Sequence, residues 1–121
     1  MEQNDRQPLL LEENLKKALT ELLILQLLST KEYYIGQLTA TLHEKSGGIL
    51  SIVFPYGAVY RLQQSGYIAE SEKRCAPDGR RRQYFKITQK GGSYLQELLE
   101  VYRKLAKGVS AVLEGEGKDD A

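Results

Sequence analysis

Three consecutive arginines, Arg80, Arg81 and Arg82, directly follow a Pro-Asp-Gly turn sequence. Each guanidinium group presents parallel N–H donors, which suit the oxygens of a phosphate or a carboxylate. Between Lys73 and Lys90 there are seven positive side chains and one negative one, so this segment carries a net charge of +6 while the whole chain carries +1. Such a concentration favours contact with a polyanion, and a solvated loop kept soluble by its charge is the plainer alternative.

The sequence offers few residues for other chemistry. It contains one histidine, His43, and one cysteine, Cys75, with no Gly-rich phosphate loop and no metal-ligand spacing. We therefore expect no enzymatic activity, no cofactor and no metal. A single cysteine excludes an internal disulfide and fits a reducing compartment. Charged residues interrupt the apolar stretch from Leu9 to Leu28, so we expect neither a membrane span nor a secretory signal, and a cytoplasmic location.

Three helical patterns occupy the first half of the chain. Apolar residues recur three and four positions apart from Leu11 to Leu28, which predicts the first helix. A second helix is predicted within residues 31–48, where the Gly47-Gly48 pair is suited to end it. The third pattern offers Ser51 as an N-cap and stops at Gly66.

After Gly66 the pattern changes from helical spacing to alternation. Residues 67–73 and 81–88 have the composition of strands, and Ala-Pro-Asp-Gly provides the turn chemistry between them. These features predict a β-hairpin. Thr88 is suited to cap a final helix, although Gly91 and Gly92 weaken the first turn of that helix. The fold class predicted is mainly α with a small β-hairpin.

Three helices, a hairpin and a long helix form the order of a winged helix-turn-helix, in which the third helix enters the major groove of DNA. We therefore expect a flexible segment at 1–10 and a winged helix-turn-helix DNA-binding domain at 11–88. A C-terminal dimerisation helix would follow at 89–114, and a disordered tail at 115–121.

The outer side of the third helix supplies candidate DNA contacts, because its apolar residues are expected to pack inward. Arg61 is suited to guanine and Gln64 to adenine, while Gly57 allows a close approach of the backbone. Tyr56 and Tyr60 suit phosphate contacts and partly buried packing equally well. The predicted DNA-binding residues are Tyr34, Gln37, Ser51, Tyr56, Gly57, Tyr60, Arg61, Gln64, Arg80, Arg81 and Arg82.

The final helix also has the apolar spacing of a coiled-coil seam. A domain of this size leaves little core for such a helix to cover, so we expect a homodimer. The alternative is a helix lying on the core of its own domain. The predicted interface residues are Leu11, Leu15, Leu95, Leu98, Leu99, Tyr102, Leu105, Val109 and Val112.

Two stretches resemble the PadR-type transcriptional regulators. "SIVFPYGAVYRLQQSGYIAESEK" and "RRQYFKITQKG" fit the family pattern at residues that include Tyr56, Leu62, Gly66, Tyr84 and Gly91. "LTELLILQLLS" resembles the first helix of the family, so the similarity covers roughly residues 15–113. The chain differs in two places. "IVF" and a glycine stand where the family has Pro-Gly-Thr and a proline, and "YIGQL" stands where it has His-Gly-Tyr-Glu-Leu.

This resemblance implies a homodimeric repressor that binds double-stranded DNA at a roughly palindromic site. It also implies a small aromatic effector near the dimer interface, with Leu95, Leu99, Tyr102 and Leu11 or Leu15 as candidate lining residues, unless these side chains are simple core. The alternative function is a winged-helix protein-interaction module without DNA binding, whose hairpin holds an acidic partner. Salt-sensitive binding to duplex DNA distinguishes the two functions.

Overall fold

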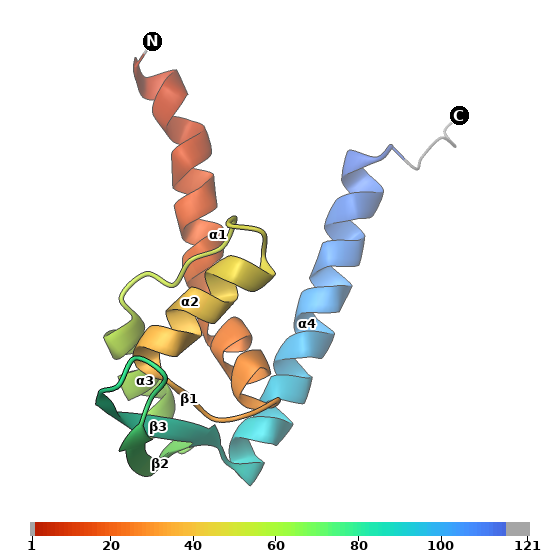
Figure 1. Ribbon diagram of the computed structural model, residues 1–121. Helices are drawn as coiled ribbons and strands as arrows, with labels where there is room; N and C mark the ends of the chain where they lie inside the picture. The colour runs from red at the N-terminus through yellow and green to blue at the C-terminus, as the bar shows by residue number, and fades with distance from the viewer. Residues whose placement is uncertain (1, 116–121) are drawn as a thin grey trace.

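The computed structural model describes residues 2–115, with side chains from Pro8 onward. The elements are α1 (Glu2–Leu28), β1 (Tyr33–Tyr34), α2 (Ile35–Lys45), α3 (Pro55–Gln64), β2 (Ile68–Cys75), β3 (Arg81–Ile87) and α4 (Gln89–Leu113). The first three helices pack together with a small sheet, and α4 runs back beside α1 (Figure 1). Farther from the sheet, α1 and α4 diverge from one another. The predicted fold, mainly helical with a winged hairpin and a long last helix, is confirmed.

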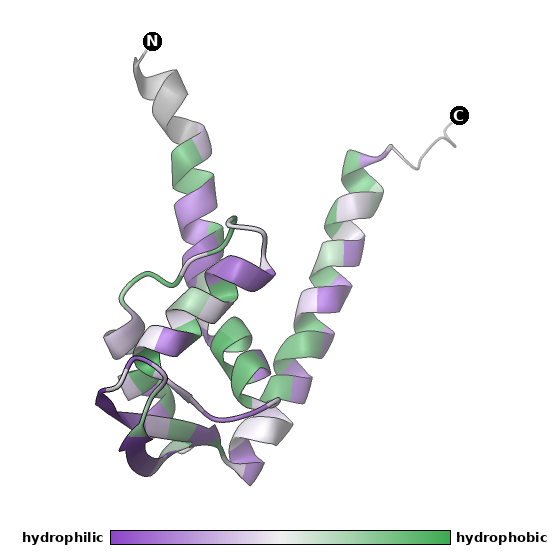
Figure 2. Ribbon diagram, in the orientation of Figure 1, coloured by the Kyte–Doolittle hydropathy of each residue, from purple (hydrophilic) through white to green (hydrophobic). Residues whose placement is uncertain are grey.

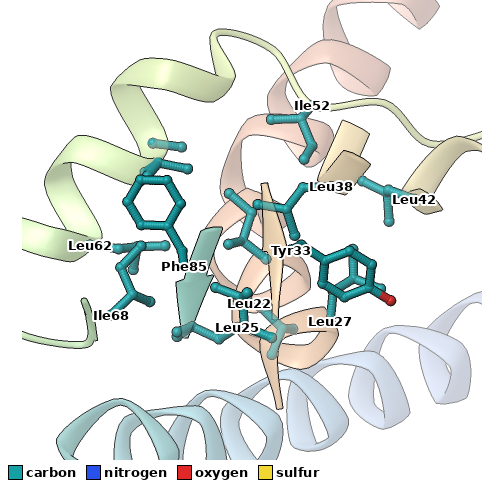
Figure 3. Close-up of a cluster of buried hydrophobic side chains, with 14 of the residues drawn as sticks. Leu22, Leu25, Leu27, Tyr33, Leu38, Leu42, Ile52, Leu62, Ile68 and Phe85 are labelled. Atoms are coloured by element: carbon teal, nitrogen blue, oxygen red, sulfur yellow. The ribbon is translucent and has the colours of Figure 1, made fainter. Parts of the chain in front are cut away.

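The second half of α1 forms the centre of the hydrophobic core (Figure 3). Ile24 and Leu25 are fully buried because apolar residues surround the helix there, as the widened apolar stripe in the sequence indicates. Each such side chain contributes about 1.5–3 kcal/mol by its burial. The buried members outside α1 come from every later element and from the loop before α3: Tyr33, Leu38, Leu42, Ile52, Ala58, Val59, Leu62, Ile68, Phe85 and Leu95.

The sheet has three antiparallel strands in the order β1-β3-β2, so the predicted hairpin gains a third strand. Tyr33 pairs with Phe85 and Tyr34 pairs with Tyr84. Tyr34, predicted near the start of the second helix, is the N-cap residue directly before Ile35 and also belongs to the short strand β1, which the sequence pattern did not predict. A strand of two residues has no periodicity of its own, and only its distant partner strand defines it.

Glycines end the helices as predicted. The backbone N–H of Gly48 donates to the carbonyl of His43 over 2.8 Å, and Gly47 and Gly48 have φ angles of +69° and +84°. Gly66 has a φ of +82° just after α3. These left-handed conformations cost glycine little, so they allow the chain to turn immediately after each helix.

The start of α3 differs from the prediction. Ser51 is not its N-cap, because the helix begins at Pro55 and Phe54 occupies the capping position with a φ of 55°. The fixed φ of proline suits the first helical position, which explains the later start. Ile52 is buried in the core and anchors the loop before the helix. Phe54 is 75% exposed, and its left-handed backbone costs about 1–3 kcal/mol.

The first turn of α4 is fastened to the turn between α3 and β2. A Cβ added at Gly91 would lie 2.0 Å from the carbonyl oxygen of Tyr67, so only glycine fits this contact. The ammonium group of Lys90 donates to the carbonyl of Ser65 over 2.9 Å. Tyr94 stacks on Tyr67, with ring centroids 4.0 Å apart. The glycine that weakens the helix locally is therefore required by the packing.

The two ends of the chain differ from the sequence pattern in different ways. α1 already begins at Glu2, before the apolar pattern that starts at Leu11, since periodicity detects an apolar face but not a polar extension of the helix. The predicted tail at 115–121 lies outside the described residues except for Gly115. Within residues 2–115, no helix is long and apolar enough to cross a membrane.

Candidate nucleic-acid interface

The third helix presents one buried face and one exposed face. Ala58, Val59 and Leu62 are at most 3% exposed and pack on the core, as the helical period predicts. On the opposite side, Tyr56 is 72% exposed and Tyr60 is 62% exposed. Large aromatic side chains with this exposure contribute nothing to the core. The remaining predicted outward residues are Gly57, which is half-buried, and Arg61 and Gln64, which are exposed.

Arg61 lies at the surface between α3 and α1. Its Nε is 3.5 Å from a carboxylate oxygen of Glu21, a distance at which an exposed pair contributes little. Its Nη1 lies 3.6 Å from the position that a Cβ on Gly57 would occupy. The contact with Glu21 therefore restrains the guanidinium group of Arg61 only weakly. Its predicted contact with guanine is compatible with this placement.

The three arginines of the hairpin turn are not equivalent. Arg80 and Arg81 are exposed, whereas Arg82 is half-buried and its Nη2 lies 2.6 Å from Oδ2 of Asp78. The guanidinium group of Arg82 also lies over the ring of Tyr34, 5.3 Å from its centroid. The hydrogen bond from Arg82, and a second from the backbone of Arg80, lower the pKa of Asp78. Arg82 therefore stabilises the turn, and Arg80 and Arg81 are the side chains left for a partner.

Pairing within the protein reduces the positive charge that the sequence concentrates in this segment. Arg74 pairs with Glu32 and Glu72, and Arg82 pairs with Asp78. In the part of the chain that the structure describes, no acidic group lies within 4.0 Å of the side-chain nitrogens of Lys73, Arg80, Arg81 and Lys86. These four cations form the wing surface that can approach an anion.

The residues predicted near the start of the second helix are less accessible. Tyr34 is half-buried and packs edge-on against Tyr84, with ring centroids 5.5 Å apart. Gln37 is half-buried, and among the described residues its buried Oε1 has no hydrogen-bond partner. Ser51 is half-buried in the loop before α3. Direct DNA contacts from these three side chains stay a prediction.

Sequence reasoning missed two features of this region. It did not identify Arg74 as an internally paired residue, because the partner Glu32 is 42 positions away. It also did not predict that Phe54 would be exposed at the capping position of α3. The signal available for Phe54 was Pro55 directly after it, which marks a first helical position.

A second surface lies between the diverging helices α1 and α4. A groove of about 560 Å³ opens there, and hydrophobic residues continue along both helices away from the core (Figure 2). Of the residues predicted at the dimer interface, Leu95 is 3% exposed and belongs to the core of its own domain, which removes it from that surface. Leu98 and Leu99 are half-buried against the core. The others are exposed: Leu11, Leu15, Tyr102, Leu105, Val109 and Val112.

Only some of the residues predicted to line an effector pocket lie in this groove. Leu15 and Tyr102 line the groove, whereas Leu11, Leu95 and Leu99 do not. The groove is instead completed by the following residues: Ala18, Leu19, Leu22, Leu98, Val101, Leu105, Ala106, Val109 and Ser110.

The model of the PadR-like family of transcriptional regulators matches residues 24–97, more than half of the 121 residues. The chain belongs to this family. The matched region of this PadR-like regulator spans the core of α1, the helix-turn-helix, the wing and the first turns of α4. Its members are transcriptional regulators with a winged-helix DNA-binding fold rather than enzymes.

Solved structures of transcriptional regulators, some of them PadR-like, share the fold. A PadR-like transcriptional regulator from Bacillus cereus is 26% identical, with a TM-score of 0.70 over 81% of this chain and 94% of that chain. A Streptococcus transcriptional regulator is 27% identical, with a TM-score of 0.65 over 76% of this chain and 89% of that chain. A PadR family regulator from Eggerthella lenta, 22% identical, has a TM-score of 0.73 over 95% of this chain and 99% of that chain. A comparison with curated proteins found no match.

Proposed function

We propose that this PadR-like regulator binds a roughly palindromic DNA site as a homodimer, with α3 in the major groove and the wing on the adjacent backbone. The observation that carries this proposal is the presence of two exposed surfaces: the outer face of α3 and the four wing cations without an acidic partner. Phosphate contacts from Arg80 and Arg81 would supply salt-dependent affinity.

Selection of bound duplexes from a random DNA pool, followed by affinity measurements at several salt concentrations, tests this function. We expect an enriched palindrome, with half-sites about one DNA turn or more apart. Arg81→Ala should lower the slope of log affinity against log salt by about 0.9. Lys104→Ala on α4 is the matched control, because it removes the same charge far from the wing and should leave the slope unchanged. Binding that enriches no sequence and ignores salt would favour the protein-interaction module.

The homodimer in this proposal uses the exposed apolar side chains of α1 and α4. Tyr102, Leu105 and Val109 are each at least 45% exposed, and together they form a contiguous apolar surface of the kind that marks an interface. A second copy of the chain covers such a surface symmetrically. Val109→Asp should therefore give a monomer in sedimentation measurements. Lys107→Asp introduces the same side chain outside the groove and should stay dimeric.

Repression and its release by a small aromatic effector complete the proposal. The groove between α1 and α4 has a volume in the range of small-molecule sites, and its lining is apolar apart from Tyr102 and Ser110. Ala18→Phe would fill part of this groove without touching α3. We expect this variant to keep its DNA affinity and to lose release by aromatic compounds that dissociate the unmodified protein. Equal release of both proteins would place the effector elsewhere.

A further inference from the structure

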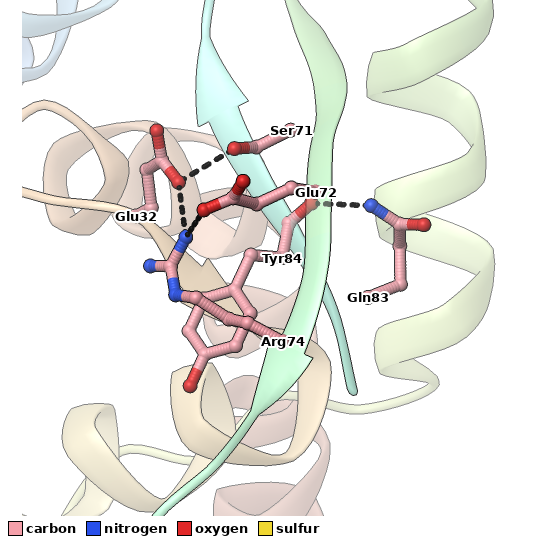
Figure 4. Close-up of polar contacts among 6 residues, drawn as sticks. All are labelled: Glu32, Ser71, Glu72, Arg74, Gln83 and Tyr84. Atoms are coloured by element: carbon pink, nitrogen blue, oxygen red, sulfur yellow. Dashed lines mark hydrogen bonds and ion pairs between the residues drawn. The ribbon is translucent and has the colours of Figure 1, made fainter. Parts of the chain in front are cut away.

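The carboxylate of Glu32, on the loop between α1 and β1, holds strand β2 at two points (Figure 4). Its Oε1 accepts a hydrogen bond from the hydroxyl of Ser71 over 2.6 Å and another from Nη1 of Arg74 over 3.0 Å. These bonds join segments about forty positions apart in the chain. The hydrogen bond from Ser71 and then that from Arg74 lower the pKa of Glu32, so the carboxylate is charged at neutral pH.

Ser71 and Arg74, the two residues that Glu32 holds, lie at and just after a β-bulge in strand β2. Glu70 pairs with Phe85 and Lys73 pairs with Gln83, so Ser71 and Glu72 together face one residue of β3. A bulge of this kind bends its strand and changes the direction of the hairpin beyond it. Because most residues beyond the bulge are exposed, the core does little to fix that direction. A contact at the bulge is therefore well placed to fix it.

The partner of Glu32 is itself held in place. The guanidinium group of Arg74 lies 3.7 Å from the centroid of the Tyr84 ring, and Tyr84 is only 5% exposed. Tyr84 in turn packs against Tyr34 of β1. Stacking of this kind restrains arginine more than an ion pair alone does. Arg74 also bonds to Glu72 over 3.0 Å, but that contact stays within β2 and connects nothing else.

We propose that Glu32 is a positioning residue of the wing, which sets the direction in which Arg80 and Arg81 point toward DNA. This inference rests on the proposed function. It assigns Arg74, the cation nearest the carboxylate, to the internal structure rather than to phosphate contact.

The direction in which a Glu32 substitution changes DNA affinity distinguishes this role from a general electrostatic effect. Removing an acidic side chain near a polyanion normally strengthens binding, because repulsion decreases. Loss of Glu32 should instead weaken binding, because the wing loses its fixed direction. Glu72→Ala is the matched control. This substitution also removes a carboxylate that is bonded to Arg74. Because Glu72 does not connect β2 to the rest of the domain, DNA binding by this variant should stay equal or become tighter.

The decisive experiment measures DNA affinity and its salt dependence for Glu32→Ala, Glu72→Ala and Arg80→Ala/Arg81→Ala, with unfolding of each variant in parallel. We expect Glu32→Ala to weaken binding roughly tenfold and to lower the salt slope by about 1 to 2, as expected for up to two lost phosphate contacts. Added to Arg80→Ala/Arg81→Ala, it should cause little further loss, since both changes act on the same contacts. Glu32→Leu, which has a similar size but no hydrogen-bond acceptor, replaces Glu32→Ala if that variant does not fold.

Hydrogen exchange of the hairpin turn, residues 76–82, gives a readout that does not require DNA. Faster exchange in the Glu32 variant than in the Glu72 variant supports the positioning role. Equal exchange, unchanged or tighter DNA binding, or full additivity with the arginine variants would overturn it. If the unmodified protein shows no salt-sensitive DNA binding, the proposed function fails, and exchange alone decides whether Glu32 fixes the wing.

Discussion

Two adjacent glycines in α4 are expected to respond to the same substitution with opposite signs. Gly91→Ala should destabilise the protein, because its new Cβ would lie 2.0 Å from the carbonyl oxygen of Tyr67 and 2.9 Å from Cγ1 of Ile87. Gly92→Ala should be neutral or stabilising, because no atom lies within 4 Å of its Cβ position. Both changes add one methyl group in the same helical turn, so each is the control for the other.

The magnitude follows from the geometry. A carbon and a carbonyl oxygen need about 3.3 Å, so α4 and the residue before β2 must separate by about 1.3 Å. Overpacking of this kind costs about 1–3 kcal/mol. The same carbonyl accepts the N–H of Thr88 over 3.0 Å, and weakening that bond costs about 0.5–1.5 kcal/mol more. Alanine recovers about 1 kcal/mol of helix propensity. The net loss for Gly91→Ala is about 0.5–3.5 kcal/mol, with a midpoint of about 2 kcal/mol, against a gain of up to about 1 kcal/mol for Gly92→Ala.

Denaturant and thermal unfolding at one fixed protein concentration measure both effects, since association makes stability concentration-dependent. For a chain of this size, the Gly91 variant should melt about 10 °C below the unmodified protein. A Gly91→Ala variant as stable as the unmodified protein would refute the argument. It would mean that α4 can shift away from Tyr67 without cost.

Three further predictions concern stability. Thr88→Ala should cost about 1 kcal/mol in unfolding measurements, because its hydroxyl accepts from the N–H of Gly91 over 3.0 Å, whereas Thr88→Ser should be close to neutral. Leu25→Ala should cost about 2–5 kcal/mol, as it opens a cavity where the side chain is fully buried. The pKa values of Glu32 and Asp78 are lowered in the folded protein, so their contribution is complete above the unfolded values of about 4.3 and 3.9 and is lost as the pH falls through the folded ones. Unfolding measured from pH 6 to pH 3 should accordingly show a smaller loss of stability for Glu32→Gln than for the unmodified protein.

Local patterns in the sequence predicted the features that depend on local structure. The spacing of Ala58, Val59 and Leu62 predicted the buried face of α3, and therefore the exposure of Tyr56 and Tyr60. Helix ends at glycines and the hairpin turn follow from backbone preferences of single residues. These features need no knowledge of the rest of the chain, so the sequence alone determines them.

Features that depend on distant partners were not accessible from the sequence. β1 exists only because Tyr33 and Tyr34 pair with a strand about fifty positions later. Counting charges treated Arg74 like Arg81, although Glu32, 42 positions away in the chain, pairs with Arg74. Similarly, the seam pattern of α4 did not distinguish Leu95 in the core from the exposed leucines farther along the helix, because both have the same spacing.

The attachment of α4 also has a consequence for the spacing of DNA half-sites. The first turn of α4 is fixed to the turn after α3 by the contacts of Lys90, Gly91 and Tyr94, and no flexible linker separates them. A helix of 25 residues is about 37 Å long, and in the proposed dimer its far part contacts the second copy. A small tilt of α4 at that contact therefore moves α3 as a rigid unit. The separation between half-sites that the dimer prefers is then a property of α4, and substitutions in this helix, far from any base pair, would change it.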